Sequence, residues 1–504
     1  MPRRPGYGDA VAHARTDAAA PPARPRYLSL STSDGAAGPG SDATGSVHLE
    51  PNHLPMWKVA VLALAYVQLG PCAALSASGV IPFSGSGAWL SILVSVVVMV
   101  LLAVVVGAFA RRLVVTGSLV SYAQEAFGPR ARALVAACLT LGYVALAAAM
   151  VGTVLVFTSS ALLEVGVHSA AGLGAQSAAA IVISAIAATC AWRGVDVSVR
   201  VVVVLGFVCV PFILVTMVGS FLQLHADWRP QFVLTGISVS QMVQGAIAAT
   251  GYYVGFDGIS ALAAETREPK RNIPRVLIGT MLFFGAVTTL SCVIQYPVLA
   301  GHAEELAAGA SPVAIFAQVM GMPSLAVVVD ILIVPASLAG TVALYNLGAR
   351  IVATTAADGL LPAALSRIHP RFRSPYRAVA ALGVVGAAAP IILQAAWHAS
   401  PLLSSVYLAN LATYYWLVPY LVTCAGMLRV MQREARIDAF TALAAVLSIA
   451  ALGYATVELF RSPVDEATTF LPYVAAATIV VLVAGLIYAQ RGQTSVALAE
   501  EQVL

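Results

Sequence analysis

A series of apolar segments, each about 20 residues long, constrains this fold more than any other feature, because a helix of about 20 apolar residues crosses a bilayer. The chain of 504 residues is 60% hydrophobic and 10% charged, whereas soluble domains carry about 25% charged residues. We therefore predict an all-α integral membrane protein with twelve transmembrane helices, and not a soluble enzyme. The predicted spans are 57–81, 89–110, 133–161, 175–192, 199–222, 238–264, 275–296, 324–355, 378–397, 404–429, 439–460 and 471–490.

The positions of the basic residues predict the orientation of these spans, because Lys and Arg gather in cytoplasmic loops. Of the 27 basic residues, only Arg229 and Arg461 fall outside the N-terminal tail, the even-numbered loops and the cytoplasmic helix ends. Both termini are therefore expected in the cytoplasm, with the plasma membrane as the location. Residues 1–55, rich in Ala, Pro, Gly, Ser and Arg, are expected to form a disordered cytoplasmic tail, and 491–504 a second tail.

Cysteine and histidine positions give no indication of a metal site or a cofactor. The six cysteines lie inside apolar segments without a CxxC or Cys/His spacing, and the eight histidines lie in the tail or in loops. The net charge of +4 says little about nucleic acid. We predict no metal, no cofactor and no nucleic-acid partner; the expected partners are the lipid bilayer and a small molecule.

The sixth span, 238–264, is interrupted by two glycines that flank an acid. Gly255 and Gly258 each weaken a helix by about 1 kcal/mol, and an ionised Asp257 in hydrocarbon costs several kcal/mol more. Such a segment is stable only where its backbone and charge face protein or a water-filled cavity. Broken helices at mid-membrane are typical of the binding sites of secondary transporters.

The first span contains a second interruption, in the stretch AYVQLGPCAALSASGVIP. Gly70-Pro71 is expected to stop the helix, because proline lacks a backbone donor and clashes with the preceding turn. Cys72 and Ala73 would restart it with N–H groups that suit a carboxylate. An ordinary proline kink is the alternative. Breaks in the first and sixth spans are five helices apart, as expected of two inverted five-helix repeats.

The break in the sixth span offers the complementary group, a set of backbone acceptors. Carbonyls freed around Tyr252 to Gly255 could bind an ammonium, with those of Tyr253 and Val254 as the candidates. Tyr252 or Phe256 would close over the substrate side chain. Donors in one break and acceptors in the other predict a zwitterionic amino acid or a related amine as the ligand.

Two further residues are candidates for the binding site. Asp257 is either a ligand or gating group, or a structural acceptor that holds the broken backbone, and the sequence leaves both open. Tyr143 in the third span is a candidate pocket residue by its depth.

Three residues of the eighth span are candidates for ion coupling. Asp330 is an intramembrane acid that could carry a proton, unless it is solvated from an outer vestibule. Ser337 and Thr341, four residues apart, share a helix face. With carbonyls near Gly70 they could bind sodium, although hydroxyls bonded to their own helix are the more ordinary interpretation.

An inner gate is a separate hypothesis. Glu265, Arg350 and Asp358 are expected at the cytoplasmic face, where they could form an ion-pair gate or solvated loop ends.

Three stretches resemble the amino acid–polyamine–organocation (APC) permease superfamily between about residues 57 and 430. They are ARRLVVTGSLVSYAQEAFGPRA, with a short helix over 118–127, GFDGISALAAETREPKRNIP, and NLGARIVATTAADGLLPAALSRIHPRFRSPYRA. The resemblance implies a LeuT-like fold with discontinuous first and sixth helices, in which 56–222 and 238–429 are inverted repeats and 439–490 forms two trailing helices. It also implies amino acid uptake or exchange by alternating access.

The chain departs from the superfamily at positions that bear on substrate and coupling. Gly70-Pro71-Cys72 replaces a Gly-Ser-Gly break, and Gly251 stands where members often place an aromatic gate. The position of a lysine in some proton-coupled members is here about Cys209. A polyamine or organic-cation exchanger that uses Asp257, or less favourably a non-transporting amino acid sensor, is therefore kept as an alternative.

Overall fold

The computed structural model describes residues 54–115, 117–193, 199–225, 227–234, 236–307, 309–357, 359 and 361–501. Within these ranges the side chains at 65, 66, 199–203, 264, 307 and 486–501 are not described. The predicted N-terminal tail, apart from its last two residues, and Asp358 lie outside the described residues.

Ten long helices make up most of the described chain, because in hydrocarbon the backbone must satisfy its own hydrogen bonds. They are α4 (Ala88–Arg112), α6 (Pro129–Glu164), α7 (Leu173–Trp192), α8 (Val199–Gln223), α10 (Pro269–Leu299), α13 (Pro323–Ala357), α14 (Tyr376–Trp397), α15 (Pro401–Arg433), α16 (Ala439–Arg461) and α17 (Glu466–Glu501). α17 thus continues past the predicted end of the last span at 490.

Shorter elements lie at helix breaks and between the long helices. The α-helices among them are α1 (Met56–Tyr66), α2 (Leu69–Leu75), α3 (Ile81–Ser84), α5 (Ser118–Phe127), α9 (Val239–Thr250), α11 (Ala303–Ala307) and α12 (Pro312–Val319). The 3₁₀ helices are η1 (Gly85–Gly87), η2 (His168–Ala171), η3 (Pro230–Phe232), η4 (Phe256–Ala264) and η5 (Ala363–Ser366). The short helix expected over 118–127 corresponds to α5.

Eleven stretches of the described residues are long and apolar enough to cross a membrane. Each of these stretches overlaps a different predicted span. The sixth predicted span is the one that has no matching stretch. Residues 238–264 instead form α9 and η4, separated by a turn over 251–255, and neither piece alone reaches membrane-spanning length. The chain is therefore an all-helical integral membrane protein.

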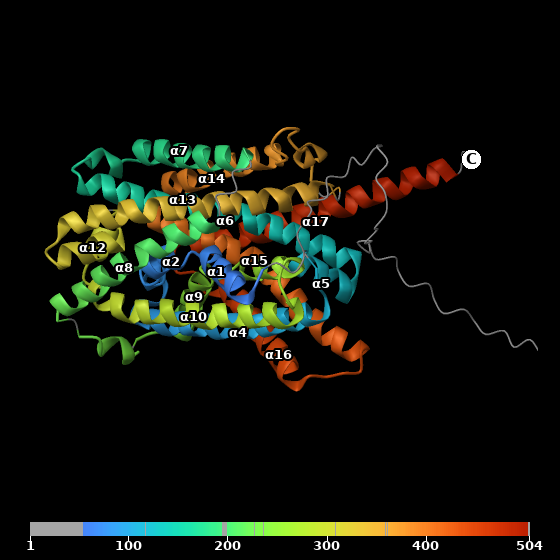
Figure 1. Cartoon of the computed structure of the whole chain (residues 1–504), viewed down its shortest axis with the longest axis horizontal. Coiled ribbons are helices and arrows are strands. Elements are labelled where there is room, and N and C mark those ends of the chain that lie inside the picture. Colours follow the sequence, from blue (N-terminus) through green and yellow to red (C-terminus); the bar gives the residue numbers. More distant parts are fainter. Residues whose placement is uncertain are drawn as a thin grey trace, which may run out of the picture. The chain divides into compact units, whose positions relative to one another are not determined.

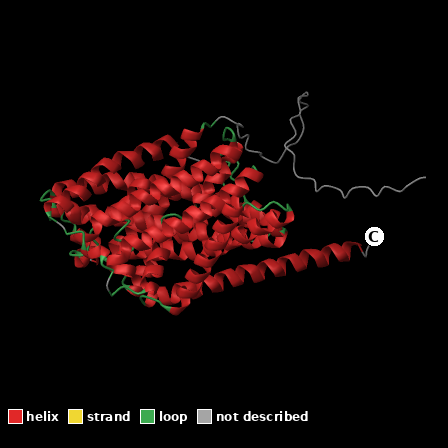
Figure 2. Ribbon diagram, turned by 90° about the horizontal axis from the view of Figure 1, so that it is seen from below, coloured by secondary structure: helices red, strands yellow, loops and turns green. Residues whose placement is uncertain are grey.

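The long helices pack side by side, and α6 runs along both α13 and α15 (Figure 1). α4 packs along α10, α7 packs along α14, and the last two helices contact α15. Figure 2 shows helices joined by loops. In the described chain, the one β-type backbone pairing is an isolated bridge between Leu54 and Thr266.

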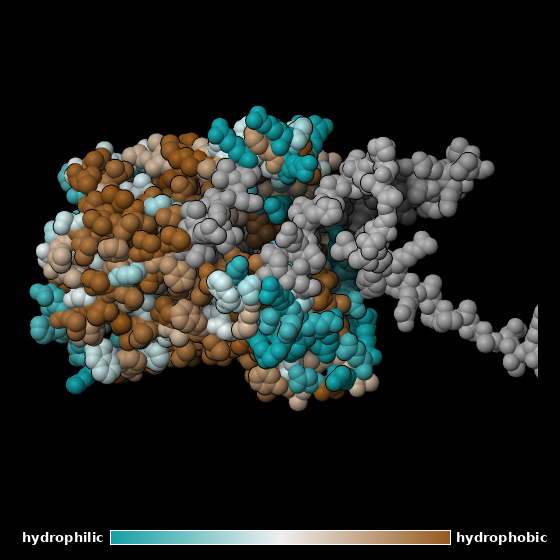
Figure 3. All heavy atoms as spheres, viewed as in Figure 1, coloured by the Kyte–Doolittle hydropathy of each residue, from teal (hydrophilic) through white to brown (hydrophobic). Residues whose placement is uncertain are grey.

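Apolar side chains cover much of the outer surface. In the view of Figure 3, hydrophobic residues spread over most of the face, and hydrophilic residues gather at the end where α5 lies. Large side chains such as Ile181 on α7, Phe212 on α8 and Leu443 on α16 are exposed. In water such patches would promote association, whereas in a bilayer they face lipid tails.

Candidate functional site

The first predicted span is interrupted at Val67 and Gln68, and again by a turn over 76–80, and not at Gly70-Pro71 as predicted. α1 ends at Tyr66, Gln68 has a left-handed backbone (φ 51°, ψ 59°), and α2 begins at Leu69. The proline explains the shift. In a continuous helix, the ring of Pro71 would clash with the carbonyl four residues earlier, at Val67. In the first turn of α2 the missing N–H of the proline costs nothing, because first-turn N–H groups have no partner within the helix.

The groups expected to hold a carboxylate are partly engaged within the protein. The Cys72 N–H donates to the carbonyl of Gln68 at 3.0 Å, so the prediction that it is free is wrong. Gly70 faces α8: a Cβ added there would lie 2.5 Å from Cys209 Sγ and 3.1 Å from the Gly206 carbonyl oxygen. Gly70 is therefore a packing contact between α2 and α8.

The C-terminal end of α2 is held by two residues from distant parts of the chain. Gln295 Nε2 on α10 donates to the Ala73 carbonyl at 2.7 Å, and the Tyr252 hydroxyl donates to the Leu75 carbonyl at 2.9 Å. Sequence reasoning missed Gln295. The signal was present, since Gln295 is a polar residue inside an otherwise apolar segment.

The two neighbouring tyrosines of the second break, Tyr252 and Tyr253, contact different helices. Gly255 has a left-handed backbone (φ 88°), which glycine adopts without strain. Tyr252 reaches α2, whereas Tyr253 turns to α10, where its hydroxyl lies 2.6 Å from Thr288 Oγ1. The Tyr253 carbonyl accepts from the Phe256 N–H at 3.2 Å, which leaves its second lone pair for a ligand.

Asp257 is buried (1% exposed) and fastened to two other elements. Its Oδ1 accepts hydrogen bonds from Trp416 Nε1 and the Tyr420 hydroxyl of α15, both at 3.2 Å. Its backbone carbonyl accepts from Ser118 Oγ of α5 and from Ser260 Oγ. Of the two predicted roles, this geometry favours the structural acceptor.

Trp416 gathers several of the predicted residues into one aromatic cluster. Its ring packs edge-on against Tyr143 with centroids 4.9 Å apart. The rings of Phe256 and Tyr420 lie 6.0 Å apart. Sequence reasoning missed Trp416 and Tyr420, because their place beside Asp257 depends on how α15 packs.

Gln68 of the first break packs against the eighth predicted span next to Ser337 and Thr341. A Cβ added at Gly340 of α13 would lie 2.4 Å from Gln68 Nε2, so Gln68 packs directly against this helix. Thr341 Oγ1 donates to the Ser337 carbonyl at 2.8 Å, the ordinary interpretation. Ser337 Oγ is buried and has no hydrogen-bond partner among the described residues.

Asp330 lies apart from both breaks, nearer the start of α13. It is 0% exposed, so the alternative that an outer vestibule solvates it is wrong. Its Oδ1 accepts from Ser311 Oγ at 2.7 Å.

The predicted inner gate is not assembled from the residues that are described. Glu265 uses its backbone carbonyl to accept from the Leu54 N–H at 3.0 Å, and Arg350 is exposed. No ion pair joins Glu265 to Arg350 in the described part of the chain.

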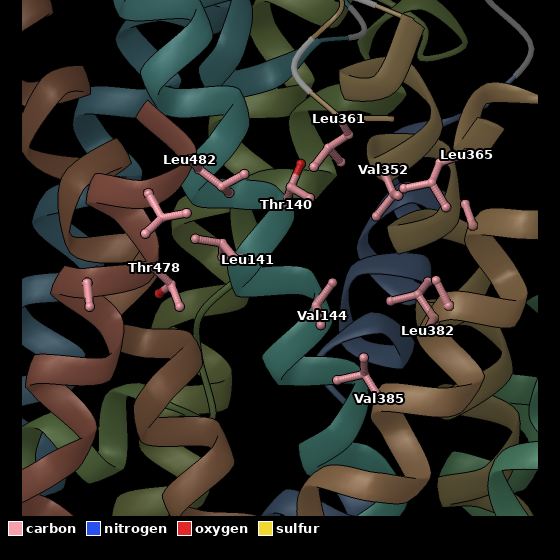
Figure 4. A pocket seen from close by; sticks show the side chains of 14 residues that line it. Thr140, Leu141, Val144, Val352, Leu361, Leu365, Leu382, Val385, Thr478 and Leu482 are labelled. Atoms are coloured by element: carbon pink, nitrogen blue, oxygen red, sulfur yellow. The ribbon is translucent and has the colours of Figure 1, made fainter. Parts of the chain in front are cut away.

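A cavity of about 390 Å³ lies between α6, α13, α14 and α17, but it does not suit a zwitterion (Figure 4). Its only hydroxyls, on Thr140 and Thr478, are bonded to Thr355 and Tyr415. None of the predicted site residues lines it. The lining residues are Thr140, Leu141, Val144, Val352, Leu361, Leu365, Ala378, Ala381, Leu382, Val385, Ala477, Thr478, Val481 and Leu482.

A helical membrane bundle in which two broken helices contact each other is the architecture of a secondary transporter. Within that class, a sequence profile described as amino acid permease matches residues 54–484, and the chain belongs to this family.

Relatives and solved structures agree with this class. The branched-chain amino acid permease BcaP of Bacillus subtilis is 25% identical over 60% of this chain and 67% of its own length. The methylthioribose transporter of the same organism is 28% identical over 55% of this chain, and the match spans 61% of that relative. A manganese transporter of Eremococcus coleocola shares the fold alone, with a TM-score of 0.54 at 11% identity, covering 87% of this chain and 97% of that one.

The packing of Gly70 gives a first prediction. Gly70→Ala should destabilise the protein by about 1–3 kcal/mol, because the added methyl overpacks the contact with Cys209. Thermal unfolding of the purified protein measures the effect. Combining it with Cys209→Ala should recover part of the loss. Gly279→Ala is the control, since its added Cβ meets nothing within 4 Å; equal losses in both variants would contradict the packing role.

The two neighbouring tyrosines provide a matched pair for a second prediction. Tyr252→Phe should lower stability by about 0.5–1.5 kcal/mol, the net value of one hydrogen bond, because the Leu75 carbonyl keeps the Gly79 N–H and Ser78 Oγ as donors. Tyr253→Phe should lower it by a similar amount, since Thr288 Oγ1 keeps its bond to the Phe284 carbonyl. Thermal unfolding of both variants is the measurement, and a loss above about 3 kcal/mol at either tyrosine would contradict these roles.

Proposed function

We propose that this protein transports an amino acid across the membrane by alternating access, with the substrate bound between the breaks of α1–α2 and α9–η4. The contact that carries the proposal is the hydrogen bond from Tyr252 to the Leu75 carbonyl, which joins the two broken helices at 2.9 Å. The family match and the relatives named as amino acid permeases support the substrate class.

In this proposal the substrate amine binds backbone carbonyls of the second break, at Tyr253 and Val254. The carboxylate binds at the first break near Gln68, and not at the Cys72 N–H, which is already engaged. Tyr252 lies between the breaks, so a movement that separates them must exchange its bond to Leu75 for another partner. That exchange would couple substrate occupancy to helix movement.

The arrangement of the helices is part of the same proposal. The 56–222 and 238–429 segments would be inverted repeats, with the C-terminal helices trailing. The distribution of basic residues supports cytoplasmic termini and a plasma-membrane location. Transport would be cation-coupled or exchanging. Ser337 and Thr341, beside Gln68, are the candidate sodium ligands, and Asp330 is the candidate proton carrier.

A ligand screen tests the substrate class. Purified protein is heated with each amino acid and each common polyamine, with and without sodium and at several pH values. A true ligand raises the unfolding temperature in proportion to the logarithm of its concentration over Kd. We expect a shift with one class of amino acid, and flux of that amino acid into liposomes. Shifts with polyamines alone would favour a cation exchanger, and binding without flux would favour a sensor.

Variants at Asp257 test whether its charge is used. Asp257→Asn keeps an acceptor for Trp416 and Tyr420, so stability and amino acid binding should both persist. Asp257→Ala removes the acceptor of the buried Trp416 Nε1–H, at a cost of about 1–3 kcal/mol. Thermal unfolding with and without the amino acid distinguishes these outcomes. Loss of binding in a stable Asp257→Asn protein would instead make the carboxylate a ligand.

A further inference from the structure

A short, mostly buried helix covers a buried acid at one end of the bundle. All residues of α12 from Pro312 to Ala317 are buried, and α12 packs against α13 and α8 and also touches α2. Asp330 of α13 lies beneath its start. In the predicted topology this connection, between α10 and α13, faces the outside. α12 is therefore placed as an outer lid over the first broken helix.

Ser311 joins the lid to the acid. Its hydroxyl donates to Asp330 Oδ1 at 2.7 Å and accepts from the Ala314 N–H, so the same group caps α12. Its N–H donates to Ser160 Oγ of α6 at 3.0 Å. Movement of α12 away from the bundle must break these contacts, and it would expose Asp330 to water.

The second carboxyl oxygen of Asp330 is unusual because it is buried and has no partner among the described residues. A buried, unpaired charge costs far more than a buried neutral group, so such groups are neutralised or paired. The described side chains of α12, α8 and α2 include no basic residue. A proton is the smallest cation that could occupy this oxygen.

Other titratable groups near this site are few. Glu164 at the end of α6 accepts from Gln318 Nε2 of α12 at 2.8 Å. The titratable groups on the helices that pack against α12 include Cys209 of α8, Cys72 of α2, and Cys292 and Tyr296 of α10, and Arg200 stands at the start of α8. Glu304 and Glu305 lie on α11. The ionisable residues of α7 and α14, Arg130 and Arg132 of α6, and Arg350 of α13 lie far along their helices from Asp330.

We propose that Asp330 is a proton-binding site that is filled when the α12 lid closes and emptied to the outer solution when it opens. In the open lid, water solvates the carboxylate. On closure one proton from the outer water binds Oδ2, Ser311 Oγ–H again donates to Oδ1, and the Ser311 N–H again donates to Ser160 Oγ. No other proton is transferred. The inference rests on the proposed transport function only in naming the proton as the coupling ion.

The sign of the pH dependence follows from this linkage. A hydrated Asp has a pKa of about 3.9 and is ionised at neutral pH, so closure takes up a proton. Acid therefore favours the closed lid. Each unit of pH changes the ratio of closed to open protein by up to about tenfold.

Hydrogen exchange of the α12 backbone in the full-length purified protein tests the proposal. Exchange rates of a peptide covering 309–319 are measured between about pH 5 and about pH 8, at constant sodium, and corrected for intrinsic exchange. We expect protection of α12 to rise as pH falls. Asp330→Asn, which stays neutral and still accepts from Ser311, should be protected at every pH. Glu304→Gln, at an exposed acid of α11, is the control and should keep the wild-type dependence.

Two more readouts keep the test decisive if Asp330→Asn does not fold. Ser311→Ala keeps the acid but removes its contact with α12, so protection should fall at every pH. Infrared spectra of the wild type should show a protonated carboxyl band that weakens as exchange of α12 rises.

Three outcomes would overturn the proposal: unchanged pH dependence in Asp330→Asn, loss of it in Glu304→Gln, or protection that follows sodium at fixed pH. No substrate is needed, so failure of the amino acid assignment would leave this result standing.

Discussion

The need to pair backbone groups in an interior without water governs this structure. Each helix break frees carbonyls and N–H groups that solvent cannot satisfy, so each break needs partners from another element. For α2 these partners are Gln295 and Tyr252, which add to local donors at Ser76, Ser78 and Gly79. The breaks are therefore stabilised by their own turns and also by contacts with each other and with α10.

The same requirement gives the site one part that is anchored by several hydrogen bonds and another part whose hydrogen bond can be replaced. Asp257 is held by Trp416 and Tyr420 of α15 and by Ser118 of α5, so the start of η4 is anchored to two elements outside the breaks. The bond from Tyr252 to Leu75, in contrast, is a single contact between the two broken helices. A substrate with its own polar groups could replace such a contact at small net cost, because it offers equivalent hydrogen bonds.

Prediction from sequence succeeded where the signal is local and failed where it depends on packing. The apolar segments predicted eleven of the membrane-length stretches, and α5 was predicted from its motif. The first break was placed too late, because a proline distorts the turn before it and not its own position. Cys72 was expected to have a free N–H for the same reason. For Asp330 the sequence left solvation from an outer vestibule open as an alternative, since nothing in the sequence indicates that α12 covers it.

The sequence by itself determined the membrane-spanning segments, the presence of breaks in the first and sixth predicted spans, and the family of the protein, because these follow from apolar length, glycine and proline chemistry, and local motifs. The tertiary structure decided the partners. Tyr252 with Leu75, Asp257 with Trp416, and Asp330 with Ser311 each join separate elements, and most of these pairs are far apart along the chain. Local sequence cannot specify such contacts, because they depend on how whole helices pack and on which face of each helix turns inward.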